Sequence, residues 1–197
     1  MSLLCACSSE PRESSGDSSL PQPVELSDAL PDSVSTEWRV LNGTGFRLRY
    51  PSNATVSPGR SHPNDWQGTA IRGPLIHVST EADQGPSDGP AYQLVVSTLP
   101  KSGSQTLDTW VDSLVSARNA TLDPDWRLDA PDSVLVGASR GLQLRPGCGD
   151  CDPYEVYLAR GEVVVVLSYL FDAGFPGDRE RQKEVYRLML STFEWVP

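Results

Sequence analysis

The sequence contains no run of 18 apolar residues, so it offers no segment long enough to cross a bilayer as a helix. Positive charge is also scarce: 16 Lys and Arg stand against 26 Asp and Glu, which gives a net charge of −10. A chain of this charge is poorly suited to neutralising phosphates, and we expect no nucleic-acid partner. The only two histidines, His62 and His77, do not stand in the paired spacing of a metal site.

The 197 residues are enough for one sizeable domain, and 38% of them are hydrophobic. The charge is unevenly distributed, because residues 1–37 hold seven acids and one base, a net charge of −6. This stretch also has ten serines, four prolines and no aromatic residue, so it has too little apolar surface to offset the entropy lost on folding. We therefore expect residues 1–37 to form a flexible acidic tether and residues 38–197 to form a single globular domain.

The start of the chain carries a short cysteine motif, since residues 4–9 read LCACSS. This motif resembles the lipobox of a bacterial lipoprotein, in which Cys7 would be the acylated residue. The resemblance implies an extracytoplasmic protein anchored to the bacterial cell membrane by its N-terminal lipid. The polar stretch that follows would then be a spacer that lets the domain clear the membrane surface. The alternative is that Cys5 and Cys7 are incidental cysteines of a tail.

Alternation of apolar and polar residues predicts strands along most of the domain. Residues 46–50 (FRLRY) alternate strictly, and the turn signal Asn42-Gly43 just before them predicts that residues 38–41 pair back as a hairpin arm. Further strands are expected at residues 75–80, 91–99, 133–136, 139–145, 154–160 and 162–170. Residues 57–74 and 81–90 are expected to be loops, with at most a short strand at 69–71.

Two amphipathic stripes predict helices. The first helix is expected at residues 107–118 after an N-cap at Thr106, with the apolar positions Leu107, Trp110, Val111, Leu114 and Val115. The second is expected at residues 178–192, with the apolar positions Val185, Leu188, Met189 and Phe193. Residues 163–167 are all apolar, which predicts a central strand buried on both faces. We therefore expect an α+β fold, an antiparallel β-sheet with helices packed on its faces as an α/β/α sandwich.

Several segments of the domain resemble PsbP-like domains. Residues 45–51 (GFRLRYP) look like the opening motif of that family, and the helix at 107–118 looks like its mid-domain helix. Residues 187–195 (RLMLSTFEW) resemble its terminal helix and the aromatic motif that follows, so the resemblance spans residues 38–197. It implies an α/β/α architecture and a binding, assembly or accessory role, often as a lipoprotein, and it implies no active site.

Cys148 and Cys151 have C-x-x-C spacing in an expected loop between two strands. A redox pair of the thioredoxin type would need a helix N-terminus in a βαβ unit, which the pattern does not predict here. A zinc site would need two more ligands, and we expect no metal. We favour a small structural disulfide between Cys148 and Cys151 in an oxidising compartment, with metal and redox sites as alternatives.

No group of residues has the pattern of a catalytic site, and we expect neither enzymatic activity nor a cofactor. Trp66 and His62 lie in an expected loop and are candidates for a binding surface. The favoured interpretation is a lipid-anchored, non-enzymatic domain that binds an envelope protein or a small ligand. The alternatives are an envelope enzyme or thiol-redox protein that uses the Cys148/Cys151 loop, and a purely structural spacer.

Overall fold

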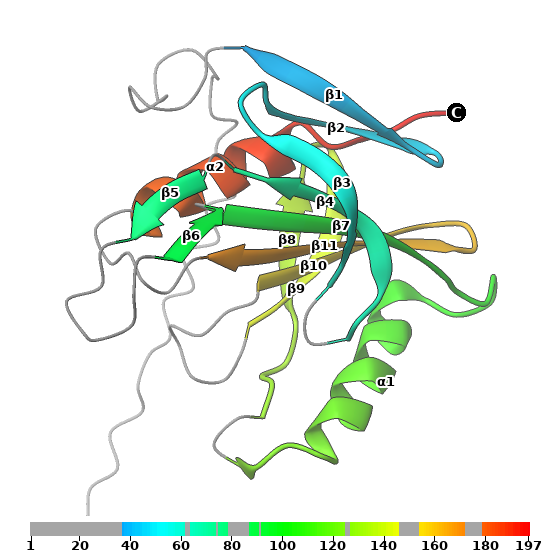
Figure 1. Ribbon diagram of the computed structural model, residues 1–197. Helices are drawn as coiled ribbons and strands as arrows, with labels where there is room; N and C mark the ends of the chain where they lie inside the picture. Colours follow the sequence, from blue (N-terminus) through cyan, green and yellow to red (C-terminus); the bar gives the residue numbers. More distant parts are fainter. Residues whose placement is uncertain are drawn as a thin grey trace, which may run out of the picture.

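A computed structural model describes residues 37–61, 64–73, 75–78, 87–90, 92–124, 127–145, 154–171 and 179–197 (Figure 1). Several predicted features lie outside these residues: the tether predicted at 1–37 except for residue 37, the lipidation site Cys7 within it, His62, Cys148 and Cys151. Within the described ranges the chain forms two helices and three antiparallel sheets. None of the helices found there is both long and apolar enough to span a membrane.

The main sheet has seven strands: β3 (Thr55–Arg60), β4 (Gln67–Arg72), β7 (Tyr92–Pro100), β8 (Asp132–Val136), β9 (Ser139–Leu144), β10 (Tyr154–Arg160) and β11 (Val163–Phe171). Their order is β3-β4-β7-β11-β10-β9-β8, and every neighbouring pair is antiparallel. β11 lies between β7 and β10, and the side chains of Val164 to Leu167 have no exposed surface. The predicted central strand is therefore confirmed.

A smaller sheet contains β1 (Trp38–Gly43), β2 (Phe46–Pro51) and β12 (Glu194–Trp195) in the order β1-β2-β12. β1 pairs with β2 along its whole length, which confirms the predicted hairpin. The remaining two strands, β5 (Leu75–Val78) and β6 (Ser87–Pro90), pair with each other.

The alternation predicted for β2 is confirmed. Phe46, Leu48 and Tyr50 are buried, whereas Arg47 and Arg49 are exposed. The strand therefore presents an apolar face to the core and a cationic face to the solvent.

Both predicted helices are present. α1 spans Leu107–Asn119, and the hydroxyl of its N-cap Thr106 accepts a hydrogen bond from the backbone N–H of Thr109 at 3.1 Å, as predicted. α2 spans Arg179–Ser191. The apolar positions predicted around this helix are all buried, namely Val185, Leu188, Met189 and Phe193.

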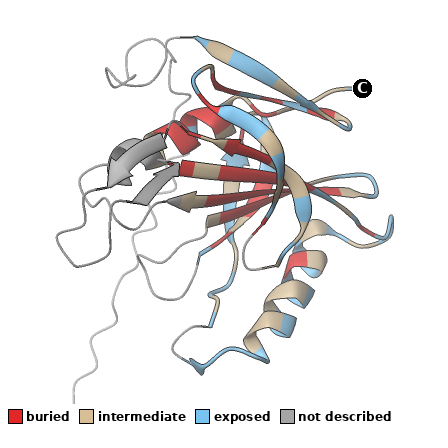
Figure 2. Ribbon diagram, viewed as in Figure 1, coloured by how far each residue is buried: buried red, intermediate tan, exposed pale blue. Residues whose placement is uncertain are grey.

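The core consists of two clusters of buried side chains (Figure 2). The first includes Val156 and Leu158 of β10 together with residues of α2 and β2. The second includes Tyr157 of β10 together with Val111 of α1. Because successive residues of a strand point to opposite faces, the main sheet is apolar on both faces. The predicted α+β class with an antiparallel sheet is confirmed.

Two predicted loops are wrong in part, since residues 57–74 contain most of β3 and all of β4, and residues 87–90 form β6. The short strand expected at 69–71 lies within β4. Pro58 and Gly59 weaken the strand signal of β3, but β3 is the edge strand of its sheet, where a missing N–H donor is tolerated. Gly68 in β4 has a packing role, because a Cβ at this position would lie 2.3 Å from the carbonyl oxygen of Val96. The two-residue strand β12 was not predicted either.

Three tyrosines stack within the first cluster. The ring centroids of Tyr92 and Tyr169 are 6.0 Å apart, and those of Tyr169 and Tyr186 are 4.5 Å apart. The buried hydroxyls of Tyr92 and Tyr186 make no hydrogen bond within the described part of the chain. Burial raises the pKa of both phenols, so both remain neutral.

Candidate functional site

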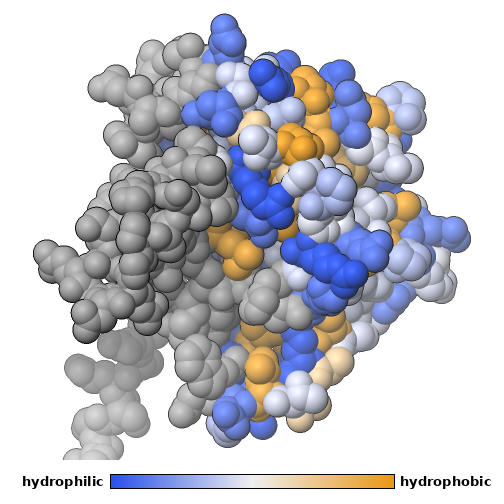
Figure 3. Space-filling model, in the orientation of Figure 1, coloured by the Kyte–Doolittle hydropathy of each residue, from blue (hydrophilic) through white to orange (hydrophobic). Residues whose placement is uncertain are grey.

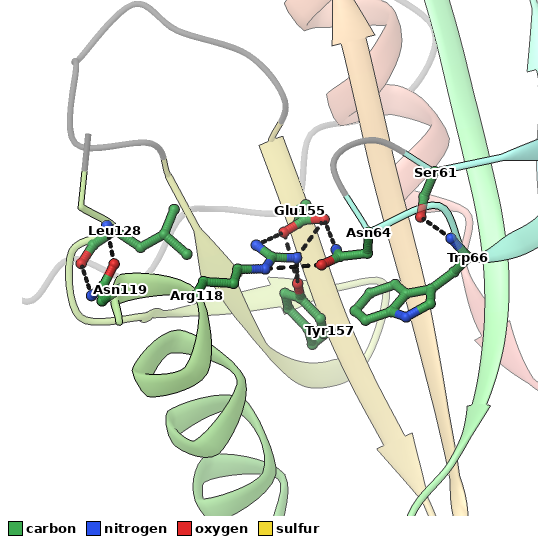
Figure 4. A network of polar contacts seen from close by, with 8 residues as sticks. All are labelled: Ser61, Asn64, Trp66, Arg118, Asn119, Leu128, Glu155 and Tyr157. Carbon is green, nitrogen blue, oxygen red and sulfur yellow. Dashed lines mark hydrogen bonds and ion pairs between the residues drawn. The ribbon is translucent and has the colours of Figure 1, made fainter. Parts of the chain in front are cut away.

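Polar side chains from three separate segments meet beside the second cluster (Figure 4). Arg118 lies in the last turn of α1, Glu155 and Tyr157 lie on β10, and Asn64 lies in the connection from β3 to β4. Glu155 and Tyr157 are two residues apart on one strand, so their side chains point to the same face of the sheet. That face is the one on which α1 packs.

These four residues form a closed hydrogen-bond network. Arg118 donates to both carboxylate oxygens of Glu155, from Nη1 at 2.6 Å and from Nη2 at 3.1 Å, and it donates from Nε to Asn64 at 3.0 Å. Asn64 and Tyr157 each donate to Glu155, at 3.0 Å and 2.7 Å. Glu155 therefore accepts hydrogen bonds from all three of its neighbours, which is the arrangement that a buried carboxylate requires.

The network is buried. The exposed fraction of the side chain is 12% for Arg118 and 2% for Glu155. Burial by itself lowers the pKa of Arg118, but interactions with Glu155 and Tyr157 more than offset this effect, and the pKa is raised. Burial, followed by the charge of Glu155, raises the pKa of Tyr157 well above its usual value. Arg118 therefore stays cationic and Tyr157 stays a neutral donor.

Trp66 lies over this network. The guanidinium of Arg118 is 5.9 Å from the centroid of the Trp66 ring, and the Trp66 and Trp110 rings are 6.3 Å apart. Trp110 in turn packs against Tyr157, with ring centroids 5.9 Å apart. Trp66 and Trp110 are both half-buried. We call Trp66 and Trp110 the tryptophan pair.

Hydrogen bonds between Ser61 and Trp66 also fix the connection between β3 and β4. The backbone N–H of Trp66 donates to the hydroxyl of Ser61 at 3.2 Å, and the N–H of Ser61 donates to the carbonyl of Trp66 at 2.9 Å. Asp65 between them has a positive φ of 55°, which is uncommon for a residue with a side chain. A tight loop therefore presents Trp66, and Asn64 ties this loop to Arg118 and Glu155.

The predicted site residues are distributed as follows. Trp66, predicted as part of a binding surface, lies between β3 and β4 beside the network, and its binding role stays a prediction. His62, Cys7, Cys148 and Cys151 lie outside the described residues. Sequence reasoning missed Asn64, Arg118, Glu155 and Tyr157. One signal was available, because Glu155 is the single acid in the apolar strand YEVYLAR and so had to be buried with a cationic partner.

The arrangement is suited to holding a surface in place. The polar groups of the network bond mainly to one another, so the network joins α1, β10 and the connection between β3 and β4. Within the described ranges, no group of three or more His, Cys, Asp and Glu side chains could hold a metal ion. The tryptophan pair is partly exposed, as are Asn64 and Arg118 at the edge of the network.

Comparison with known proteins extends this description. No family model and no curated protein sequence matches the chain. The solution structure of PsbP from the cyanobacterium Synechocystis sp. aligns with 85% of this chain and 98% of its own, at 11% identity and a TM-score of 0.50. A crystal structure from Bacteroides thetaiotaomicron aligns with 78% of this chain and 46% of its own at 12% identity, and its TM-score of 0.36 is too low to indicate a shared fold. The chain therefore has a PsbP-like fold, as its sequence predicts.

Replacing Arg118 with Met should destabilise the protein strongly, because Glu155 would keep a buried charge without a cation. Removing one partner of a buried ion pair costs about 3–5 kcal/mol. The double variant Arg118→Met/Glu155→Leu should recover a large part of this loss, because both charges are then absent. Urea unfolding of the wild-type protein, the single variant and the double variant measures their free energies of unfolding.

The substitution Arg140→Met is the matched control. Arg140 pairs with Asp108 at 3.2 Å, but both side chains are more than half exposed, and such pairs contribute about 0–1 kcal/mol. If Arg118→Met and Arg140→Met lowered the free energy of unfolding equally, this description of the network would be contradicted. A double variant no more stable than Arg118→Met would also contradict it.

Proposed function

We propose that this protein is a non-enzymatic binding domain of the bacterial cell envelope, anchored by a lipid on Cys7, and that the tryptophan pair is the centre of a surface that binds a protein partner. The observation that carries the proposal is the position of Trp66, which is half-buried at the surface and held there by a buried ionic network.

The chemistry of the tryptophan pair supports this role. Tryptophan is among the residues that contribute most to protein–protein affinity, because it combines a large apolar area with a polar N–H. The loop of Trp66 is already fixed by Ser61 and Asn64, so it would lose little conformational freedom on binding. A preorganised aromatic surface of this kind favours a folded protein partner.

The distribution of hydrophobic side chains over the surface is consistent with a small binding centre. On the face seen in Figure 3, the described hydrophobic side chains are exposed singly or in small groups among hydrophilic ones. Affinity would then depend on a few anchoring side chains, as in many protein–protein interfaces. We infer a non-enzymatic role because the polar groups beside Trp66 bond to one another.

The proposal also includes an α/β/α sandwich architecture and the lipid anchor on Cys7. Alternate residues of β10 pack with α2 and with α1, which supports an α/β/α sandwich. The sequence of residues 8–36 supports a spacer, and a flexible chain of that length would place the domain roughly 30 Å from its anchor. A spacer of this kind would let the tryptophan pair reach a partner at the membrane surface.

The variant Trp66→Ala should lose partner binding. In quantitative capture from an envelope extract of the source bacterium, the partner should be enriched by the wild-type chain and depleted roughly tenfold with Trp66→Ala, which corresponds to about 1.4 kcal/mol. The control is Leu135→Ala, an exposed apolar residue of β8 that is 58% exposed. If no captured protein depends on Trp66, or if every one depends equally on Leu135, the proposed surface is wrong.

The variant Cys7→Ala should lose the lipid. Metabolic labelling of the source bacterium with a fatty-acid analogue should label the wild-type protein and leave Cys7→Ala unlabelled, because Cys7 is the residue that the lipobox motif assigns for acylation. The variant Cys5→Ala is the matched control and should retain the label. A wild-type protein without label, or a labelled Cys7→Ala variant, would reject the anchor.

A further inference from the structure

The main sheet ends in two edge strands, β3 and β8, which differ in how well they are protected from pairing. Among the described strands, β3 pairs only with β4 and β8 pairs only with β9. An open edge can pair with a strand of another molecule, and proteins often prevent this with a proline or a charged residue. The register of the neighbouring strands shows which backbone groups point to each open edge.

The edge of β3 is blocked by a proline. The backbone N–H of Gly73 donates to the carbonyl of Tyr92 at 2.9 Å, so alternate residues of β4 bond to β7, and the residues between them, such as Ala70, bond to β3. Ala70 lies opposite Ser57, and the next residue, Pro58, therefore points to the open edge. Because proline has no N–H to donate, this edge is poorly suited to pairing.

The edge of β8 keeps its donors. A two-residue turn joins β8 to β9 and makes Val136 and Ser139 a hydrogen-bonded pair. Bonded pairs recur at every second residue of an antiparallel pair of strands, so Val134 also bonds to β9. The backbone N–H and C=O groups of Ser133 and Leu135 therefore point to the open edge, which presents two donors and two acceptors.

The side chains at the edge of β8 are also suited to contact with another molecule. Leu135 is 58% exposed, more than any other large hydrophobic side chain of the described residues. The charged residues of β8 and β9 are each paired within the molecule, Asp132 with Arg145 at 3.3 Å and Arg140 with Asp108 at 3.2 Å. A second copy of the chain would therefore meet an apolar side chain beside charges that are already neutralised.

The outermost strand of the smaller sheet, β1, is less suited to pairing with a copy of itself. Its residue Arg39 is exposed and forms no ion pair within the described part of the chain. Two copies paired through β1 would bring two such cations to one short edge, and like charges oppose the pairing of strands. β8 is therefore the edge that favours a second copy.

We propose that two copies of this chain pair through β8 across a two-fold axis, which joins their main sheets into one continuous antiparallel sheet. With the axis at Val134, Ser133 of each copy lies opposite Leu135 of the other and exchanges two hydrogen bonds with it. All backbone groups that point to the open edge are then bonded. Val134 lies opposite its own copy, and the two Leu135 side chains lie diagonally, within reach of each other.

This pairing ends at two copies. A two-fold contact uses the same edge of both molecules and is therefore closed, and the outer edges of the joined sheet are the two copies of β3, which Pro58 blocks. The axis that relates two antiparallel strands is perpendicular to their sheet, so both copies of α1 and both tryptophan pairs lie on one face. The proposal goes beyond the binding role of the tryptophan pair and does not depend on it.

Sedimentation equilibrium of the full chain at about 0.5 mM, where even a weak dimer is populated, tests the pairing. The wild-type chain should form a dimer. Leu135→Lys should lower the association constant at least roughly tenfold, because it brings two cations to the edge. Ser133→Pro should have the same effect, because it removes an N–H that points to the open edge and that β9 does not use. Added NaCl should strengthen the dimer, because each copy carries a net charge of −10.

Amide hydrogen exchange locates the contact. At about 20 µM the amide of Val134 should be protected by β9, and those of Ser133 and Leu135 should exchange freely, whereas at about 0.5 mM all three should be protected. The matched control is Val56→Lys on β3, where the valine is 41% exposed, and it should leave the dimer unchanged. The proposal would be overturned by a monomeric wild-type chain at about 0.5 mM, by equal effects of Leu135→Lys and Val56→Lys, or by amides of Ser133 and Leu135 that stay unprotected.

Discussion

The buried ion pair between Arg118 and Glu155 is the constraint on which the proposed binding surface depends. Moving two charges out of water destabilises a protein unless each charge finds partners in good geometry. Glu155 finds three donors, in Arg118, Tyr157 and Asn64, and each comes from a fixed place in the fold. The end of α1, the strand β10 and the connection after β3 must therefore adopt one relative position, and Trp66 is presented from that position.

The fold separates the two faces of the main sheet. Trp66 packs against the second cluster of the core, whereas β2 and its neighbours pack against the first. The tryptophan pair therefore lies on the face on which α1 packs, and the hairpin of β1 and β2 lies on the other face. The proposed binding surface and the smaller sheet are thus on opposite sides of the main sheet.

The sequence predicts the regular part of this fold well, because hydrophobic periodicity depends on local geometry. The all-apolar residues 163–167 predict the central strand, and the stripe around Val111 predicts α1. The prediction fails at β3. Pro58 and Gly59 are typical of loops, but an edge strand tolerates both residues. Within the candidate site, only Trp66 was predicted. The network was missed because Asn64, Arg118 and Glu155 are far apart in the chain, and local patterns hold no information on which distant charges will meet.

The most direct test of this account is hydrogen exchange in the variant Arg118→Met/Glu155→Leu, which removes the ion pair without leaving a buried charge. If the pair fixes the loop of Trp66, the amides of Asp65 and Trp66 should exchange roughly tenfold faster than in the wild-type protein, which corresponds to about 1.4 kcal/mol of lost local stability. The exchange of the β11 amides, which requires global unfolding, should change much less than that of Asp65 and Trp66. Unchanged exchange at Asp65 and Trp66 would show that the loop holds its position without the ion pair, and the account would be wrong.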